Sequence, residues 1–158
     1  MSRALKKDAT YADLCAVPDN FVAEILGGEL YVSPRPASPH AHATGALFVK
    51  LVGPFQEGEN GPGGWWFLSE PELHFGADVL VPDIAGWRRE RMPTIPNVAF
   101  FTQVPDWMRE VRLESRRWSL MATYEGDAKI RAEPFAGVDL PLRALWLQGT
   151  SGRLVERT

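Results

Sequence analysis

Two long apolar segments predict the main β-strands of this chain. Residues 79–87 form the more apolar of the two, and only Pro82 and Asp83 interrupt the run. Residues 65–75 predict a second strand. Pro71 indicates an edge position or a bulge there, because proline has no N–H to donate to a strand ladder. The chain is therefore expected to be rich in β-structure.

Two other segments carry helix signals. Residues 10–17 predict a short helix with Thr10 as its N-cap and Asp13 at the capping-box position, where glutamate is usual. Residues 40–53 predict the longest helix, starting near Ser38-Pro39 with proline in its first turn. Its apolar stripe consists of Ala43, Leu47 and Leu51, with Ala46 and Val49 less well aligned.

Shorter patterns complete the expected fold. Residues 21–32 predict two strands, or one bent strand, around a turn at Gly27-Gly28. The other expected elements are a short strand at 100–104, a strand at 107–113, a hairpin of residues 117–124 and 128–134, and a final helix at 140–146, with loops at 54–64 and 88–96.

This pattern predicts an α/β (α+β) fold in a single domain over residues 1–158. A β-sheet normally needs cover on its apolar faces, and the chain has few predicted helices to supply it. One sheet face is therefore expected to be open, closed by a homodimer, or packed by the C-terminal hairpin.

Composition narrows the choice of partners. The formal net charge of −3 gives no overall basic field, so any nucleic-acid binding needs locally concentrated cations. Cys15 is the single cysteine, which fits a reducing cytoplasm and excludes an intrachain disulfide. We expect no signal peptide and no membrane span, because no apolar stretch is long enough.

Acidic residues in apolar surroundings are the main candidates for chemistry. Asp83 lies within the apolar run 79–87, where an isolated charge would be costly unless paired or bound to a metal. Strand periodicity puts Asp83 on one face with Val79, Val81 and Ala85, and Glu110 on one face with Arg112. If the two strands pair, Asp83, Glu110 and Arg112 meet. Otherwise Asp83 is a turn residue and Glu110–Arg112 a surface ion pair.

Glu24 could complete a site. It lies in the apolar segment Phe21-Val22-Ala23-Glu24-Ile25-Leu26, although it could equally face solvent on an alternating strand. Mg²⁺ prefers oxygen ligands and keeps several waters, so two or three carboxylates suffice to hold it. The ion would hold a phosphate and lower the pKa of a metal-bound water. Arg112 could offset charge but cannot act as a base.

Several other features have simpler interpretations. The basic cluster Arg88-Arg89-Glu90-Arg91 could grip phosphates but is better interpreted as a solvated turn. His40 and His42 diverge on a helix, so capping or surface roles are favoured for them. Glu70, Glu72 and His74 are expected on an exposed polar face, and most tryptophans in the core.

Specific stretches of the chain resemble the bacterial putative restriction endonuclease family of the PD-(D/E)XK nuclease superfamily. They are Glu24-Ile25-Leu26-Gly27-Gly28-Glu29-Leu30-Tyr31, Ser33-Pro34-Arg35-Pro36, His40, Gly61-Pro62-Gly63-Gly64-Trp65-Trp66, Glu70-Pro71-Glu72-Leu73 and residues 79–91. By this resemblance, Asp83 and Glu110 are the two catalytic acids and Glu24 the upstream acid. The resemblance implies a mixed sheet flanked by helices, Mg²⁺ or Mn²⁺ as cofactor, DNA as substrate and often a dimer.

The chain departs from the family pattern after Glu110. Residues 112–118 resemble the family's later C-terminal hairpin, so an internal segment with a lysine-bearing helix and a core strand is missing. Two hypotheses follow. The chain is a metal-dependent DNA endonuclease, or it is a degenerate, non-catalytic module that binds DNA or a protein partner.

Overall fold

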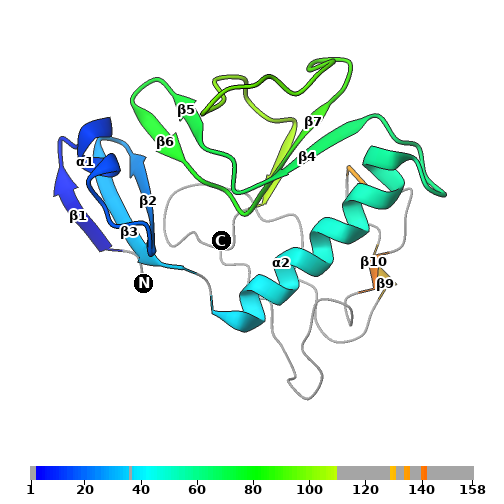
Figure 1. Ribbon diagram of the computed structural model, residues 1–158, viewed down its shortest axis with the longest axis horizontal. Helices are drawn as coiled ribbons and strands as arrows, with labels where there is room; N and C mark the ends of the chain where they lie inside the picture. The colour runs from blue at the N-terminus through cyan, green and yellow to red at the C-terminus, as the bar shows by residue number, and fades with distance from the viewer. Residues whose placement is uncertain (1–2, 36, 110–128, 131–133, 136–139, 142–158) are drawn as a thin grey trace.

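The computed structural model describes residues 3–35, 37–109, 129–130, 134–135 and 140–141. They form an α+β fold with few helices and two main antiparallel sheets (Figure 1). The expected fold class is therefore confirmed. One isolated parallel bridge joins Leu73 to Phe101. No helix in these ranges is long and apolar enough to cross a membrane.

The first sheet has five strands in the order β1-β3-β2-β6-β5. Its core consists of Ile25, Leu30 and Val79, against which the short helix packs. The predicted turn at Gly27-Gly28 is confirmed, and both glycines have positive φ. The elements of this part are β1 (Arg3–Lys7), α1 (Tyr11–Cys15), β2 (Phe21–Leu26), β3 (Glu29–Pro34), β5 (Leu73–Phe75) and β6 (Asp78–Leu80).

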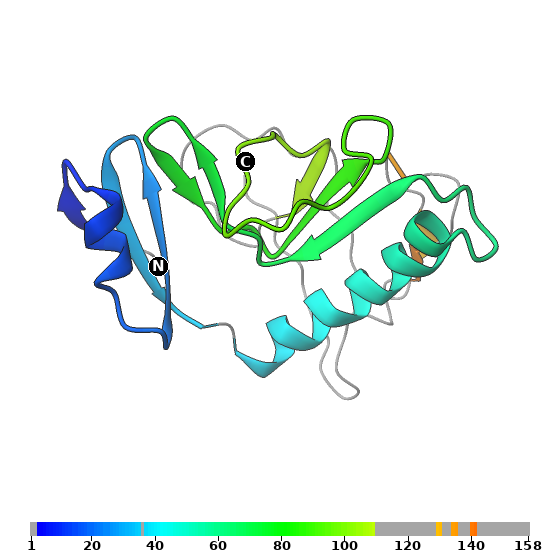
Figure 2. The same cartoon turned by 45° about the horizontal axis from the view of Figure 1, so that its top comes forward.

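The second sheet has three strands, in the order β4-β7-β8. The long helix α2 (Ser38–Leu51) runs along one side of it (Figures 1 and 2). Leu47 and Leu51 of α2 are buried against this sheet, which confirms the predicted stripe. The strands are β4 (Trp65–Ser69), β7 (Ile84–Arg88) and β8 (Trp107–Arg109).

One long hairpin supplies strands to both sheets. Residue 65 pairs with 88, 69 with 84, 73 with 80 and 75 with 78, so a single register runs through all four strands. In this register Pro71 lies opposite Pro82, and neither residue has an N–H. The ladder is interrupted there, and each predicted strand is divided in two. The expectation of one continuous strand at 65–75 and another at 79–87 is therefore wrong, because each is interrupted at its proline.

The second face of the three-stranded sheet is covered by the segment that follows β7. Met92 and Phe101 pack there against Ala85 and Trp87, and all four side chains are buried. The Trp87 indole donates to the Gln103 carbonyl at 3.0 Å. The connection between β7 and β8 therefore covers this face. The expectation of a face that is open, closed by a homodimer or packed by the C-terminal hairpin is wrong for it.

Local signals predicted both helix starts correctly. Thr10 and Asp13 form the complete capping box of α1, and α2 begins at Ser38 with Pro39 in its first turn. The expected loop at 54–64 is wrong at its start, because η1 (Val52–Glu57) continues α2 as a π-helix.

The C-terminal part departs from expectation where it is described. β9 (Lys129–Ile130) pairs with β10 (Leu140–Pro141), so the expected helix at 140–146 begins as a strand. Residues 117–124, the other arm of the expected hairpin, lie outside the described ranges.

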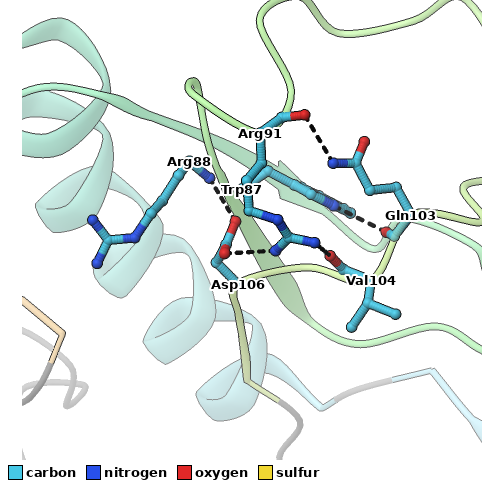
Figure 3. Close-up of polar contacts among 6 residues, drawn as sticks. All are labelled: Trp87, Arg88, Arg91, Gln103, Val104 and Asp106. Carbon is cyan, nitrogen blue, oxygen red and sulfur yellow. Dashed lines mark hydrogen bonds and ion pairs between the residues drawn. The ribbon is translucent and has the colours of Figure 1, made fainter.

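A carboxylate anchors the start of β8 to the end of β7 (Figure 3). Asp106 accepts from the backbone N–H of Arg88 at 2.9 Å and from the Arg91 guanidinium at 2.6 Å. Burial acts to raise the pKa of the Asp106 carboxyl, but the hydrogen bonds from Arg88 and Arg91 outweigh it and hold this pKa below its ordinary value.

Asp106→Asn should remove part of the acid sensitivity of the fold. Because the folded-state pKa of Asp106 is depressed, its contribution is present above the unfolded-state pKa of about 4 and is lost as the pH falls through the folded-state pKa. The stability difference between the parent and Asp106→Asn should shrink when urea unfolding is repeated from about pH 6 towards pH 3. The exposed Asp19→Asn variant is the control. A pH-independent difference would contradict this role of Asp106.

Two glycine substitutions should change stability in opposite directions. A Cβ on Gly86 would lie 2.9 Å from Cε1 of the buried Phe67 ring, so Gly86→Ala should cost about 1–3 kcal/mol. Gly45 is exposed on α2 with open space around its Cα, so Gly45→Ala should stabilise by about 0.5–1 kcal/mol. Equilibrium urea unfolding measures both, and equal effects of the two changes would refute the packing argument.

Candidate active site

Asp83 lies where the hairpin ladder is interrupted. It follows the fully buried Pro82 and precedes the first residue of β7. Its carbonyl accepts from the N–H of Glu70 at 3.1 Å, and its side chain is only 15% exposed. Residues 81–83 are not strand, so the expected sharing of one strand face with Val79, Val81 and Ala85 is wrong. The interruption directs Asp83 instead towards the start of α2.

His40 is the side chain that meets Asp83. Its Nε2 lies 2.8 Å from Asp83 Oδ1, and its own side chain is 23% exposed. Thr44, one turn further along α2, has its hydroxyl 3.4 Å from the same Nε2. The surface or capping role favoured for His40 is therefore wrong, whereas His42 is exposed as expected.

Glu24 reaches the same interrupted segment from the five-stranded sheet. Its side chain is buried, and Oε1 accepts from the backbone N–H of Val81 at 2.9 Å. In the hairpin register the partner of Val81 would be Glu72, but the Glu72 carbonyl accepts from Phe101 N–H instead, at 2.9 Å. The carboxylate of Glu24 thus replaces a missing ladder partner two residues before Asp83. The alternative of a solvent-facing Glu24 is excluded.

Glu70 marks the other side of the interruption. It is one of three non-glycine residues with positive φ in the described ranges, at 48°. Its carboxylate pairs with Arg35 at 3.4 Å. Both side chains are about half exposed, so this ion pair adds little stability. It connects the residue after β3 with the hairpin.

The predicted pairing of the two acid-bearing strands is confirmed as far as it is described. β7 and β8 are antiparallel neighbours, and Ile84 pairs with Arg109. These are the residues next to Asp83 and Glu110 in the sequence. Glu110 and Arg112 themselves lie outside the described ranges.

The donor set fits a divalent cation in chemistry, but the described residues do not complete a site. Asp83 and Glu24 both offer carboxylate oxygens, which suit Mg²⁺. Within the described ranges, no three side chains of His, Cys, Asp or Glu are grouped closely enough to hold a metal ion. A metal centre here therefore requires at least one further ligand, and Glu110 is the acid next to the last described residue of β8.

A second polar cluster joins α1 to β5. The Tyr11 hydroxyl donates to Glu72 Oε1 at 2.8 Å, and His74 Nε2 lies 2.6 Å from the same oxygen. The hydrogen bond to Glu72 raises the pKa of Tyr11 to about 12. Glu72 and His74 are partly buried, so the expected exposed polar face is wrong for them.

The arginines after β7 have structural partners. Arg89 donates to the carbonyls of Trp65 and Gln56, and its guanidinium lies 3.8 Å from the centre of the Trp66 ring. Arg91 pairs with Asp106. These contacts favour a structural role for the cluster over phosphate binding.

Comparison with known proteins identifies the family. A family model described as "Uma2: Putative restriction endonuclease" matches residues 8–131. The fold is similar to a crystal structure titled as a putative nuclease belonging to DUF820 from Anabaena variabilis ATCC 29413, with a TM-score of 0.63 and 18% identity over 87% of this chain and 97% of that one. No curated protein gives a match. Because the matched residues make up most of the sequence, the chain belongs to the Uma2 family of putative restriction endonucleases.

Proposed function

We propose that this chain is a metal-dependent endonuclease that hydrolyses phosphodiester bonds in DNA. The observation that carries the proposal is the position of Asp83, mostly buried at an interrupted ladder, with Glu24 bound two residues upstream and β8 paired beside it. Membership of a family described as putative restriction endonucleases supports this reaction class. Asp83, Glu110 and Glu24 would hold Mg²⁺ or Mn²⁺.

The proposed site residues have different roles. When bound, such an ion would activate a water molecule and neutralise charge at the phosphate. Asp83 and Glu110 supply oxygen ligands, and the pairing of their neighbours Ile84 and Arg109 supports their acting together. Arg112 would offset charge at the phosphate as the nearest cation after Glu110, without taking part in proton transfer.

The proposal also includes the substrate, the oligomeric state, the domain organisation and the location of the protein. DNA is the substrate, and a homodimer would let two such sites act on two strands. We also propose that residues 1–158 form one domain and that the protein works in the cytoplasm, where its one cysteine suits a reducing environment.

One observation favours the alternative of a non-catalytic module that binds DNA or a protein partner. The sequence has no lysine between Lys50 and Lys129. The position two residues after Glu110, where the nuclease motif has its lysine, is therefore occupied by Arg112. Arg112 replaces the charge but not the proton chemistry of that lysine. The two functions differ in turnover, which an experiment can measure.

Plasmid nicking with Mg²⁺ or Mn²⁺ tests the catalytic proposal. The parent should nick the plasmid, and Asp83→Ala and Glu110→Ala should each lower the rate at least about 100-fold, because each removes a ligand of the ion that would stabilise charge at the scissile phosphate. Glu90→Ala, an exposed acid after β7, is the matched control. Folded parent protein that binds plasmid without nicking it would establish the non-catalytic module.

Glu24→Gln separates two roles for the buried acid. The amide oxygen can still accept from Val81 N–H, so the fold should be retained, while the negative charge is lost. If Glu24 is a metal ligand, Mn²⁺ affinity measured by calorimetry should fall at least about 10-fold with an unchanged unfolding midpoint. Parent-like Mn²⁺ affinity would show that Glu24 only holds the chain at Val81.

A further inference from the structure

We propose that His40 is a positioning residue for Asp83, and that its N–H fixes the carboxylate in the orientation needed to hold the metal ion. This inference rests on the proposed function, since it assigns Asp83 as a ligand. It assigns to His40 on α2 a contact with Asp83 that the sequence patterns did not predict. The contact that carries it is the 2.8 Å distance between His40 Nε2 and Asp83 Oδ1.

A contact to the Asp83 carboxylate matters because of the place of this residue in the hairpin. The residues before it, Val81 and Pro82, are outside any strand. Val81 donates to the Glu24 side chain, and Pro82 has no N–H to donate. Regular strand on both sides would define the direction of the side chain, but here Asp83 has one hairpin bond, from the Glu70 N–H to its carbonyl, and β7 begins only at Ile84. A catalytic ligand must be held within about 0.5 Å of its productive position, so a contact to its carboxylate has a direct effect.

His40 lies on α2, which has two buried residues, whereas α1 has none. His40, Thr44, Leu47 and Leu51 follow one another at intervals of three or four residues, so they lie on one face of α2. Leu47 and Leu51 are buried in the core of the three-stranded sheet. The face that anchors the helix therefore also presents His40 to Asp83.

The direction of the hydrogen bond follows from the chemistry of the pair. An ionised carboxylate has only acceptors, so Nε2 of His40 carries the hydrogen that is donated to Asp83 Oδ1. A ring N–H that orients a ligating carboxylate resembles the outer contacts of many metal centres, whose removal typically costs 10- to 100-fold in metal affinity or activity.

The test compares three variants of the full chain with Mn²⁺ alone as the probe. His40→Leu removes the donor and keeps much of the volume, so Mn²⁺ affinity should fall about 10- to 100-fold. His40→Gln keeps an N–H donor at the end of a side chain of similar reach, so it should recover most of the affinity. His42→Leu, on the exposed side of the same helix, should leave affinity unchanged.

A cleavage assay adds a readout that a purely structural role would not give. With saturating Mn²⁺, His40→Leu should lower kcat and leave the KM for plasmid DNA near the parent value, because the contact is to Asp83 and not to DNA. Unfolding midpoints of the variants identify any loss of fold. If His40→Leu alone unfolds, His40→Ala replaces it in the comparison, and parent-like Mn²⁺ affinity of folded His40→Ala would overturn the role.

The outcomes distinguish this inference from the function on which it rests. Parent-like Mn²⁺ affinity of His40→Leu, together with loss of affinity in Asp83→Asn, would overturn the role of His40 alone. The same would follow if folded His40→Gln bound Mn²⁺ as weakly as His40→Leu. Unchanged affinity in Asp83→Asn, or no Mn²⁺ binding by the parent, would overturn the proposed metal centre itself.

Discussion

The fold depends on a pair of prolines that face each other across one hairpin. Pro71 and Pro82 occupy matching positions in a register that otherwise runs unbroken from residue 65 to residue 88. Because neither has an N–H, backbone pairing cannot continue through this point. The hairpin bends there from one sheet to the other, and the groups freed by the interruption find partners elsewhere: Val81 N–H in Glu24, and the Glu72 carbonyl in Phe101.

These replacement contacts explain how acidic groups can lie in an apolar region. A buried donor without a partner costs about 1–3 kcal/mol, so the Val81 N–H needs an acceptor, and the buried Glu24 needs a donor. Each satisfies the other. Asp83 similarly meets His40, which is presented by a helix whose apolar face is fixed in the core. The site therefore follows from the interrupted ladder.

Local signals in the sequence predicted the local structure well. The capping box of α1, the turn at Gly27-Gly28 and the stripe of α2 each depend on residues within one element, and all are confirmed. The division of the hairpin was not predicted, because an apolar run does not reveal which sheet each half joins. The signal was nevertheless present: pairing the two runs around Gly76 brings their prolines opposite each other.

For the candidate site too, the sequence predicted what depends on local signals and missed a contact between distant residues. Asp83 and Glu24 were identified from acids in apolar surroundings, which is a local signal, and the structure brings both to the interrupted segment. The sequence analysis named His40 but favoured a capping or surface role. Its contact with Asp83 was missed because the two residues are 43 positions apart and helix periodicity reports only local neighbours. The roles of Glu110 and Arg112 stay predictions, since both lie outside the described ranges.

A hairpin that belongs to two sheets also has a consequence for folding. Its strands are joined by a tight turn near Gly76, so its contacts are close in sequence and form with little loop-closure entropy. Once it forms, it presents β6 as a template for β2 and β7 as a template for β8. Neither sheet is complete without this shared hairpin, so unfolding of the hairpin would disrupt both sheets. The segment that carries Asp83 is thus part of the cooperative unit that holds the described chain together.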